Sequence, residues 1–406
     1  MKKYSQLALG PNYTLVLSNY GAVWGWGANN NGNLGIGKFS NSEPSPLKLS
    51  GIKDIVEIGA GLVHGCALTK GQDVYCWGNN ELGQLGAASP LNAVNPLPGK
   101  VPINGIKKIS VGLFNTCGLS DKSTSNQSGE VFCWGNNSEG ELGIPVNKDP
   151  NANVYNSPIK SNIFGVVSLS LGQMHTCELV DPNAAQTTQA YTPTEASALP
   201  ICFGENSFGQ LGTGSTQAGN LENSIGVKNI SAGKVHQMSA GADHTCALTT
   251  ADAGGLVYCW GFNQHGQLGN LTTENSSLPS QVKLTVSQPL AGIKEVLAQA
   301  SRTCAVTDKG TAYCWGNNSS GQLGDGTKID HYSPTQVMLS PNVPLTGVKT
   351  MAIGYSHSCA IVSVDPNKDD KIYCWGSNSK SQLGLGAGAP SSSYPLEVKM
   401  PFELSE

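Results

Sequence analysis

The sequence predicts an all-β protein in which repeated units close into a ring. Three observations lead to this fold class. One motif recurs along the chain, and its fullest copy is CAVTDKGTAYCWGNNSSGQLG, residues 304–324. Fifty glycines, together with frequent Asn and Ser, favour short strands joined by tight turns. The two ends of the chain also carry complementary parts of the repeat.

The second half of the motif is an aromatic residue followed by Gly-x-Asn-x-x-Gly-Gln-Leu-Gly. It can be followed through seven copies that are about 58 residues apart on average. Units of this length stack on their neighbours to bury an apolar face. Because they fill the chain, residues 1–406 are expected to form a single domain. The copies begin at Trp26, Trp77, Trp134, Phe203, Trp260, Trp315 and Trp375.

Each unit contains a hairpin and a proline-bearing segment. In the first unit, residues 14–17 and 22–25 are the two strands, and Leu15 is expected to lie opposite Gly25. The loop between them has three residues and ends in Gly21, which suits a backbone with positive φ. Residues 44–49 follow with two prolines. Since proline is tolerated at sheet edges, this segment is the expected outermost strand.

The termini are interpreted as parts of one blade. Residues 394–398 form an outer segment with no inner strand after it, and residues 4–9 form an inner strand with no outer strand before it. A ring closed by N- and C-terminal strands that share one blade would use both.

Composition limits the function. Charged residues are 13% of the chain and the net charge is −4, so no electrostatic footprint for nucleic acid is visible. No apolar run is long enough to span a membrane. No apolar stretch typical of a signal peptide follows Met1, so export would need another route or a leader removed from the mature chain.

Twelve cysteines occupy two fixed places in six of the repeats, and the first repeat has Leu15 and Gly25 there instead. Because the members of a pair are present or absent together, we predict one disulfide within each hairpin. Zinc is disfavoured because two isolated thiols per unit do not supply four ligands, whereas twelve reduced, buried thiols remain the alternative. Six disulfides would imply the periplasm, the cell surface or the medium. The predicted pairs are Cys66-Cys76, Cys117-Cys133, Cys177-Cys202, Cys246-Cys259, Cys304-Cys314 and Cys359-Cys374.

The units His-Thr-Cys-Ala-Leu (residues 244–248) and Tyr-Cys-Trp-Gly-x-Asn-x-x-Gly-Gln-Leu-Gly (residues 258–269) resemble repeats of the regulator of chromosome condensation family. The resemblance covers all seven units. It implies a seven-bladed β-propeller with four-stranded blades around a central channel. Departures are local: Phe203 replaces Trp, Ser381 replaces a motif Gly, and Gln299-Ala300 stand where other units have Gly.

The resemblance leaves several functions open. The founding branch contains nucleotide exchange factors for the small GTPase Ran, and other members are secreted bacterial proteins, including effectors delivered into host cells. The resemblance implies that an exchange factor would displace the nucleotide with a short wedge projecting from one blade. No such wedge can be matched residue by residue in this sequence, so no catalytic residue is assigned. No cofactor or metal is expected, and none of the common hydrolase or nucleotide-binding motifs is present.

One position, just before the Thr, Ser or Gly that precedes the first cysteine, carries large polar side chains. A partner-binding ring around one face of the propeller is the functional interpretation. The structural alternative is that each side chain bonds a nearby turn and stabilises its blade. The residues are Tyr13, His64, Asn115, His175, His244, Arg302 and His357.

We therefore expect a secreted, periplasmic or surface-exposed monomer, of the bacterial secreted type, that binds an extracellular protein without enzymatic activity. Its contacts would come from this ring or from the insertions at residues 87–100 and 144–156. The alternative is an effector-like exchange factor for a small GTPase of the Ran/Rab type. A carbohydrate-binding or hydrolytic propeller is a weaker third possibility, because no carboxylate pair marks a common site.

Overall fold

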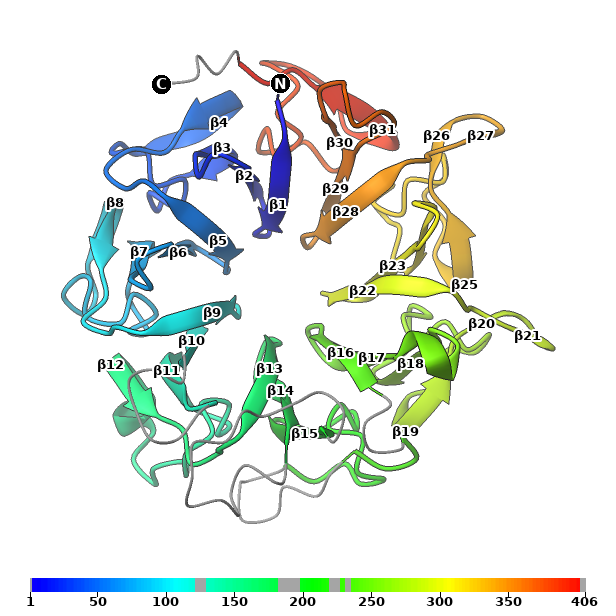
Figure 1. Ribbon diagram of the computed structural model, residues 1–406. Helices are drawn as coiled ribbons and strands as arrows, with labels where there is room; N and C mark the ends of the chain where they lie inside the picture. The colour runs from blue at the N-terminus through cyan, green and yellow to red at the C-terminus, as the bar shows by residue number, and fades with distance from the viewer. Residues whose placement is uncertain (1, 121–128, 182–197, 219–226, 231–234, 402–406) are drawn as a thin grey trace.

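The computed structural model describes residues 2–120, 129–181, 198–218, 227–230 and 235–401. Seven blade sheets surround a central channel and form a seven-bladed β-propeller (Figure 1). These residues contain no α-helix, and the two 3-10 turns among them are η1 (Pro150–Asn153) and η5 (Ala251–Ala253). The predicted fold class is confirmed.

Each blade is an antiparallel sheet of consecutive strands, with the first strand near the channel and the last at the rim (Figure 1). Blade 1 contains β1 (Tyr4–Leu9), β2 (Tyr13–Ser18), β3 (Val23–Asn29) and β4 (Ser40–Lys48). Blade 2 contains β5 (Ile55–Ala60), β6 (His64–Thr69), β7 (Val74–Asn79) and β8 (Val94–Lys100). Blade 3 contains β9 (Ile106–Val111), β10 (Asn115–Ser120), β11 (Val131–Asn136) and β12 (Val154–Lys160). Blade 4 contains β13 (Val166–Leu171), β14 (His175–Val180) and β15 (Leu199–Gly204). Blade 5 contains β16 (Val235–Ala240), β17 (His244–Thr249), β18 (Val257–Gly261) and β19 (Ser276–Gln281). Blade 6 contains β22 (Ile293–Gln299), β23 (Arg302–Thr307), β24 (Ala312–Gly316) and β25 (His331–Gln336). Blade 7 contains β28 (Val348–Ile353), β29 (His357–Val362), β30 (Lys371–Gly376) and β31 (Ser392–Val398).

Blade 4 shows three strands among the described residues, and the other six blades show four. Residues 219–226, which follow β15, lie outside the described part. So do residues 182–197, between β14 and β15. Two ribbons follow the outer strands of blades 5 and 6, namely β20 (Lys283–Thr285) with β21 (Gln288–Pro289) and β26 (Met338–Ser340) with β27 (Val343–Pro344).

The expectation that the two termini share one blade is wrong. Blade 1 takes all its strands from residues 4–48, and blade 7 takes all its strands from residues 348–398. The reason is the phase of the repeat: each unit starts with an inner strand and ends with an outer one, so one unit already completes one blade. The ring closes instead through contacts between blades 1 and 7, which lie side by side (Figure 1).

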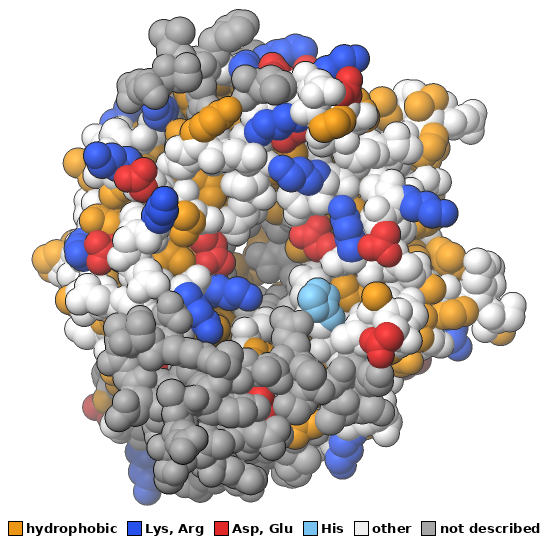
Figure 2. Space-filling model, in the orientation of Figure 1, with side chains coloured by type: hydrophobic (Ala, Val, Ile, Leu, Met, Phe, Trp, Pro, Cys, Tyr) orange, Lys and Arg blue, Asp and Glu red, His pale blue; other side chains and the backbone are white. Residues whose placement is uncertain are grey.

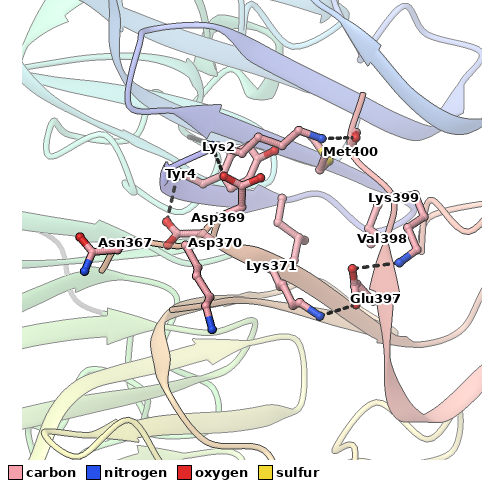
Figure 3. A pocket seen from close by; sticks show the side chains of 12 residues that line it. Lys2, Tyr4, Asn367, Asp369, Asp370, Lys371, Glu397, Val398, Lys399 and Met400 are labelled. Atoms are coloured by element: carbon pink, nitrogen blue, oxygen red, sulfur yellow. Dashed lines mark hydrogen bonds and ion pairs between the residues drawn. The ribbon is translucent and has the colours of Figure 1, made fainter. Parts of the chain in front are cut away.

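Hydrogen bonds from the start of the chain fasten this closure (Figure 3). The Lys2 amide donates to Asp369 Oδ1 at 2.8 Å, and Lys2 Nζ donates to the Met400 carbonyl at 2.7 Å. The Tyr4 amide donates to Asp370 Oδ2 at 3.1 Å. The first strand is thereby held to the hairpin and to the end of blade 7.

The hairpins have the predicted register. Leu15 pairs with Gly25, and the three-residue loop ends in Gly21 with φ 77°. The proline-bearing segments form the outermost strands, as predicted; Pro44 lies in β4 and Pro334 in β25.

The six cysteine pairs lie directly opposite one another at disulfide distance, with S–S separations between 2.05 and 2.13 Å. Each cysteine is buried. In blade 1, Leu15 Cδ2 lies 3.0 Å from the place where a Cβ on Gly25 would be, so the leucine fills the space that a disulfide occupies elsewhere.

The hydrophobic core lies between blades. The cluster between blades 5 and 6 combines Cys246 and Leu248 with Val296 and Trp315. The indole N–H of Trp315 donates to the carbonyl of Gln267 in the preceding blade at 2.9 Å. Equivalent bonds are made by Trp26, Trp77, Trp134, Trp260 and Trp375.

The motif asparagine folds the loop that supplies this carbonyl. Asn263 Oδ1 accepts a hydrogen bond from the Leu268 amide at 2.9 Å. Gly269 then packs so closely on Trp315 that an added Cβ would lie 2.6 Å from the indole nitrogen. Asparagine and glycine recur because the loop must turn tightly beneath the next blade's aromatic ring.

Candidate binding surface

The residues predicted to form a partner-binding ring are buried. Each is the first residue of the second strand of its blade, and each is at most 1% exposed. Six of the seven side chains bond the following blade, Asn115 being the exception, and none of them faces solvent. Their burial favours the structural alternative over contact with a partner.

Four histidines form the same bond. His244 Nε2 lies 2.9 Å from Thr303 Oγ1, and that hydroxyl donates to the Gln267 carbonyl at 2.8 Å. Since the hydroxyl has used its only hydrogen, it accepts from the imidazole N–H. His64, His175 and His357 bond Thr116, Thr245 and Thr14 at 2.9 to 3.0 Å.

Burial keeps these imidazoles neutral. Removal from water lowers the pKa of His244 from its ordinary 6.5 to about 3 and that of His175 to about 4. The same cause lowers the pKa of His64 and His357 to about 3.

The other ring positions differ in their bonds. Tyr13 OH donates to the carbonyls of Gly61 and His64. Arg302 donates to four acceptors of blades 6 and 7, among them the Gln322 carbonyl and Ser358 Oγ at 2.9 Å. Asn115 has a buried Oδ1 without a hydrogen-bond partner.

The seam between blades 3 and 4 departs furthest from the repeat. Phe203 has no N–H to donate, and the opposed motif residue is Glu141 where other units have Gln or Asn. Glu178 is 1% exposed, and neither of its carboxylate oxygens has a partner. It lies opposite Leu169 and Ile201 in the sheet. Burial raises the pKa of Glu178 from 4.5 to about 8, so this carboxyl is mostly protonated at pH 7.

Sequence reasoning missed an acidic and aromatic surface formed by loops at one end of the channel, here called the loop-end surface. Its residues are only partly buried, and they come from blades 3, 4, 5 and 7. Tyr355 OH, from blade 7, donates to Gln173 Oε1 of blade 4 at 3.3 Å. Because these blades are not neighbours in the ring, the loops meet across the channel. The loop-end surface consists of Glu139, Glu205, Phe208, Asp243, Phe262 and Tyr355.

The carboxylates of this surface repel one another. Burial, and then the charge of Glu205, raise the pKa of Asp243 from 3.8 to about 6. The same two causes raise the pKa of Glu139. Burial and then Asp243 raise the pKa of Tyr355 to about 12. Within the described part of the chain, no Lys or Arg forms an ion pair with any of the three acids.

Two phenylalanines adjoin the acids. The rings of Phe208 and Phe262 lie 4.8 Å apart, and His265 stands edge-on to Phe262 at 6.4 Å. His265 Nδ1 pairs with Asp330 at 2.8 Å. Aromatic groups beside unpaired charges are typical of protein-binding surfaces.

One feature of the sequence could have pointed to this surface. The residue after the Gly that follows the motif aromatic is Asn in three units, at 79, 136 and 317. Adjacent units place Glu205 and Phe262 there instead. Departures in neighbouring copies of a repeat fall side by side in a ring.

The predicted insertions lie at the rim. Residues 94–100 form β8, and residues 150–160 form η1 and β12. Leu91, Val94, Leu97 and Val146 are exposed there.

The face seen in Figure 2 has charges of both signs around the mouth of the channel. Lysines and acids alternate, so the described residues form no continuous basic stripe on this face.

Models of a known domain and of its repeat together match most of the chain. A model of the RCC1-like domain matches residues 1–288, and a model of the regulator of chromosome condensation (RCC1) repeat matches residues 309–361. The chain is 27% identical over 390 residues to the ultraviolet-B receptor UVR8 of Arabidopsis thaliana, which covers 95% of this chain and 79% of that protein. It is 30% identical over 367 residues to the E3 ubiquitin-protein ligase HERC2 of Homo sapiens, covering 89% of this chain but 7% of that protein.

Solved structures share the fold. Yeast RCC1 (Prp20), in a complex with Kap60, aligns with a TM-score of 0.73 at 20% identity, over 97% of this chain and 85% of that chain. Human WBSCR16 aligns with a TM-score of 0.73 at 20% identity, over 95% of this chain and 96% of that chain. In the part of the chain that the structure describes, no helix has the length and apolarity needed to cross a membrane.

Proposed function

Because the chain belongs to the family of RCC1-like propellers, we propose that it is a non-enzymatic scaffold that binds a protein partner through the loop-end surface. The observation that carries the proposal is the half-buried pair Phe208 and Phe262 beside acids with which no Lys or Arg of the described residues forms an ion pair. Interfaces are anchored by aromatic side chains and oriented by complementary charge. The rest of the molecule is a rigid ring that holds loops from four blades in one place.

The cysteine pairs support an oxidising location for this scaffold. Six disulfides in one chain are typical of secreted, periplasmic or surface proteins. Intact mass after alkylation without reduction tests this point. No added alkyl group is expected, and twelve added groups would place the protein in a reducing compartment.

Site-specific photo-crosslinking tests the binding surface. A photoreactive residue at Phe208 or Phe262 should crosslink a partner in a saturable manner. The same residue at Val286, which is 84% exposed on the rim, serves as the matched control. Saturable crosslinking from Val286 but from neither phenylalanine would overturn the assignment of the surface.

Nucleotide exchange on a small GTPase is the alternative function. One solved relative is yeast Prp20p, whose structure was described with its binding properties to Gsp1p and histones. At 21% identity, the likeness to Prp20p is a likeness of the fold alone. Accelerated release of labelled GDP from a GTPase panel would support exchange, and unchanged release at micromolar protein would exclude it for the GTPases tested.

A further inference from the structure

Two buried glutamines in the loops of the loop-end surface each have a hydrogen-bond donor that lacks an acceptor. Gln210 and Gln267 are fully buried, and the Nε2 amide of each has no hydrogen-bond partner. Their Oε1 atoms are used, since they accept from the backbone amides of Phe208 and His265. A buried amide donor without an acceptor costs about 1–3 kcal/mol.

The repeat shows where these free amides point. In the equivalent loops, Gln84 Nε2 donates to Asn79 Oδ1 at 3.2 Å, and Gln322 Nε2 donates to Asn317 Oδ1 at 2.6 Å. The residues that replace this asparagine in blades 4 and 5 are Glu205 and Phe262. The Glu205 carboxylate instead accepts from Ser207 Oγ at 3.1 Å.

A second equivalence places the Gln210 amide beside Asp243. In blade 7, Gln382 Nε2 reaches Asn12 Oδ1 of the next blade at 3.4 Å. Asn12 precedes the first residue of β2, just as Asp243 precedes the first residue of β17. The free donor of Gln210 is therefore directed toward Glu205 and Asp243 and bonds neither.

We propose, on the basis of the proposed binding function, that the loop-end surface takes an arginine-containing peptide segment of its partner. The guanidinium pairs with Glu205 and Asp243 and stacks on Phe262. The Nε2 amides of Gln210 and Gln267 are buried from solvent, so the segment pairs with the partly exposed acids and not with these amides.

An arginine side chain fits this surface because it supplies the cation that the acids lack and a planar group for the aromatic ring. A guanidinium offers planar donors to carboxylates and an apolar face to an aromatic ring, whereas an ammonium offers only a point charge. The described residues contain no group of three or more His, Cys, Asp or Glu placed to hold a metal ion.

Fluorescence anisotropy with three labelled peptides tests the proposal on the intact protein. The probe is Gly-Arg-Gly-Arg-Gly-Arg-Gly, and the controls carry citrulline or Glu in place of Arg. Citrulline keeps the shape of arginine but removes its charge. The Arg peptide is expected to bind at least tenfold more tightly than either control, and more weakly as salt rises from about 50 to 300 mM.

Two substitutions restore the repeat at this surface. Glu205→Asn and Phe262→Asn give each free glutamine the acceptor that Asn79 and Asn317 provide elsewhere, so both variants should fold at least as stably as the parent. Each is expected to weaken the Arg peptide three- to tenfold, and the double variant more than tenfold. Glu397→Gln is the control, because that acid is paired with Lys371 and Lys399 outside the surface.

Equal affinity for the Arg and citrulline peptides would overturn the proposal, as would unchanged affinity in a folded double variant. The first comparison uses the parent protein and does not depend on how the variants fold. Saturable partner crosslinking from Phe208 or Phe262 without Arg-peptide binding would leave the proposed function in place and reject the arginine segment. Absence of both the crosslinking and the Arg-peptide binding would reject the proposed function and the arginine segment together.

Discussion

Replacing Glu178 with Ala should stabilise the protein at pH 8 and destabilise it at pH 5. The carboxyl is 1% exposed, has no hydrogen-bond partner, and faces Leu169 and Ile201 across the sheet. Alanine suits the position, because Ala67, Ala247, Ala305 and Ala360 occupy the equivalent place in four other blades and are themselves fully buried.

The magnitude follows from the pKa difference between the folded and unfolded states. Burial raises the pKa of Glu178 from 4.5 to about 8. The unfolded chain releases this proton above pH 4.5, whereas the folded chain holds it until about pH 8, so the group costs stability as pH rises through that window. At 1.36 kcal/mol per pKa unit the cost is about 4 kcal/mol at pH 8, where half of the folded carboxyls have ionised, and about 0.8 kcal/mol at pH 5.

Truncation also removes one buried methylene group, a loss of about 0.8 kcal/mol at any pH, and the cavity that it leaves costs about 1 kcal/mol more. The net change for Glu178→Ala is therefore a gain of about 2 kcal/mol at pH 8 and a loss of about 1 kcal/mol at pH 5. Urea unfolding followed by tryptophan fluorescence at both pH values measures it. Glu178→Gln keeps the volume and should show the same change in pH dependence. A stability difference that is equal at pH 5 and pH 8 would refute the reasoning.

Three further variants test the bonds between and within blades. Thr303→Val should cost about 2–4 kcal/mol of unfolding free energy, because it leaves His244 Nε2–H buried without an acceptor, and the cost should fall in a His244→Phe background. Trp315→Phe should cost about 1–3 kcal/mol through the lost bond to the preceding blade and the smaller ring, as urea unfolding would show. Replacing Cys304 and Cys314 with serines should cost about 2–4 kcal/mol, whereas Cys304→Leu with Cys314→Gly, the pair that blade 1 uses, should retain more of the melting temperature under non-reducing conditions.

The hairpins could be predicted from the sequence because their information is local. A three-residue loop ending in glycine sets the register, and the register alone places Cys66 opposite Cys76. The closure of the ring was predicted wrongly, because a periodic sequence does not reveal where one blade ends and the next begins. Sheet pairing decides that phase, and β4 pairs with β3 of its own unit.

The ring of large polar residues illustrates a different limit. The recurrence of these residues was visible in the sequence, but the direction in which their side chains point was not. His244 points into the next blade, where its imidazole bonds Thr303, and Thr303 in turn bonds the Gln267 carbonyl. Because Thr303 lies 59 positions later in the sequence, this partner could not be recognised from the repeat alone. A side chain that recurs for packing and one that recurs for binding have the same spacing. Only burial separates them.

The repeat itself separates stability from specificity. Hydrogen bonds between neighbouring blades, such as those of His244 with Thr303 and Trp315 with Gln267, recur from blade to blade. The stability of the fold is therefore shared among all the interfaces between blades. A residue that departs from the repeat gives up one of these bonds and needs a local reason. Glu205 and Phe262 each leave a buried glutamine amide unpaired, a cost that the motif asparagine removes in other units. Both departures meet on one partly exposed surface, and a molecule that binds to Glu205 and Phe262 there would provide that reason.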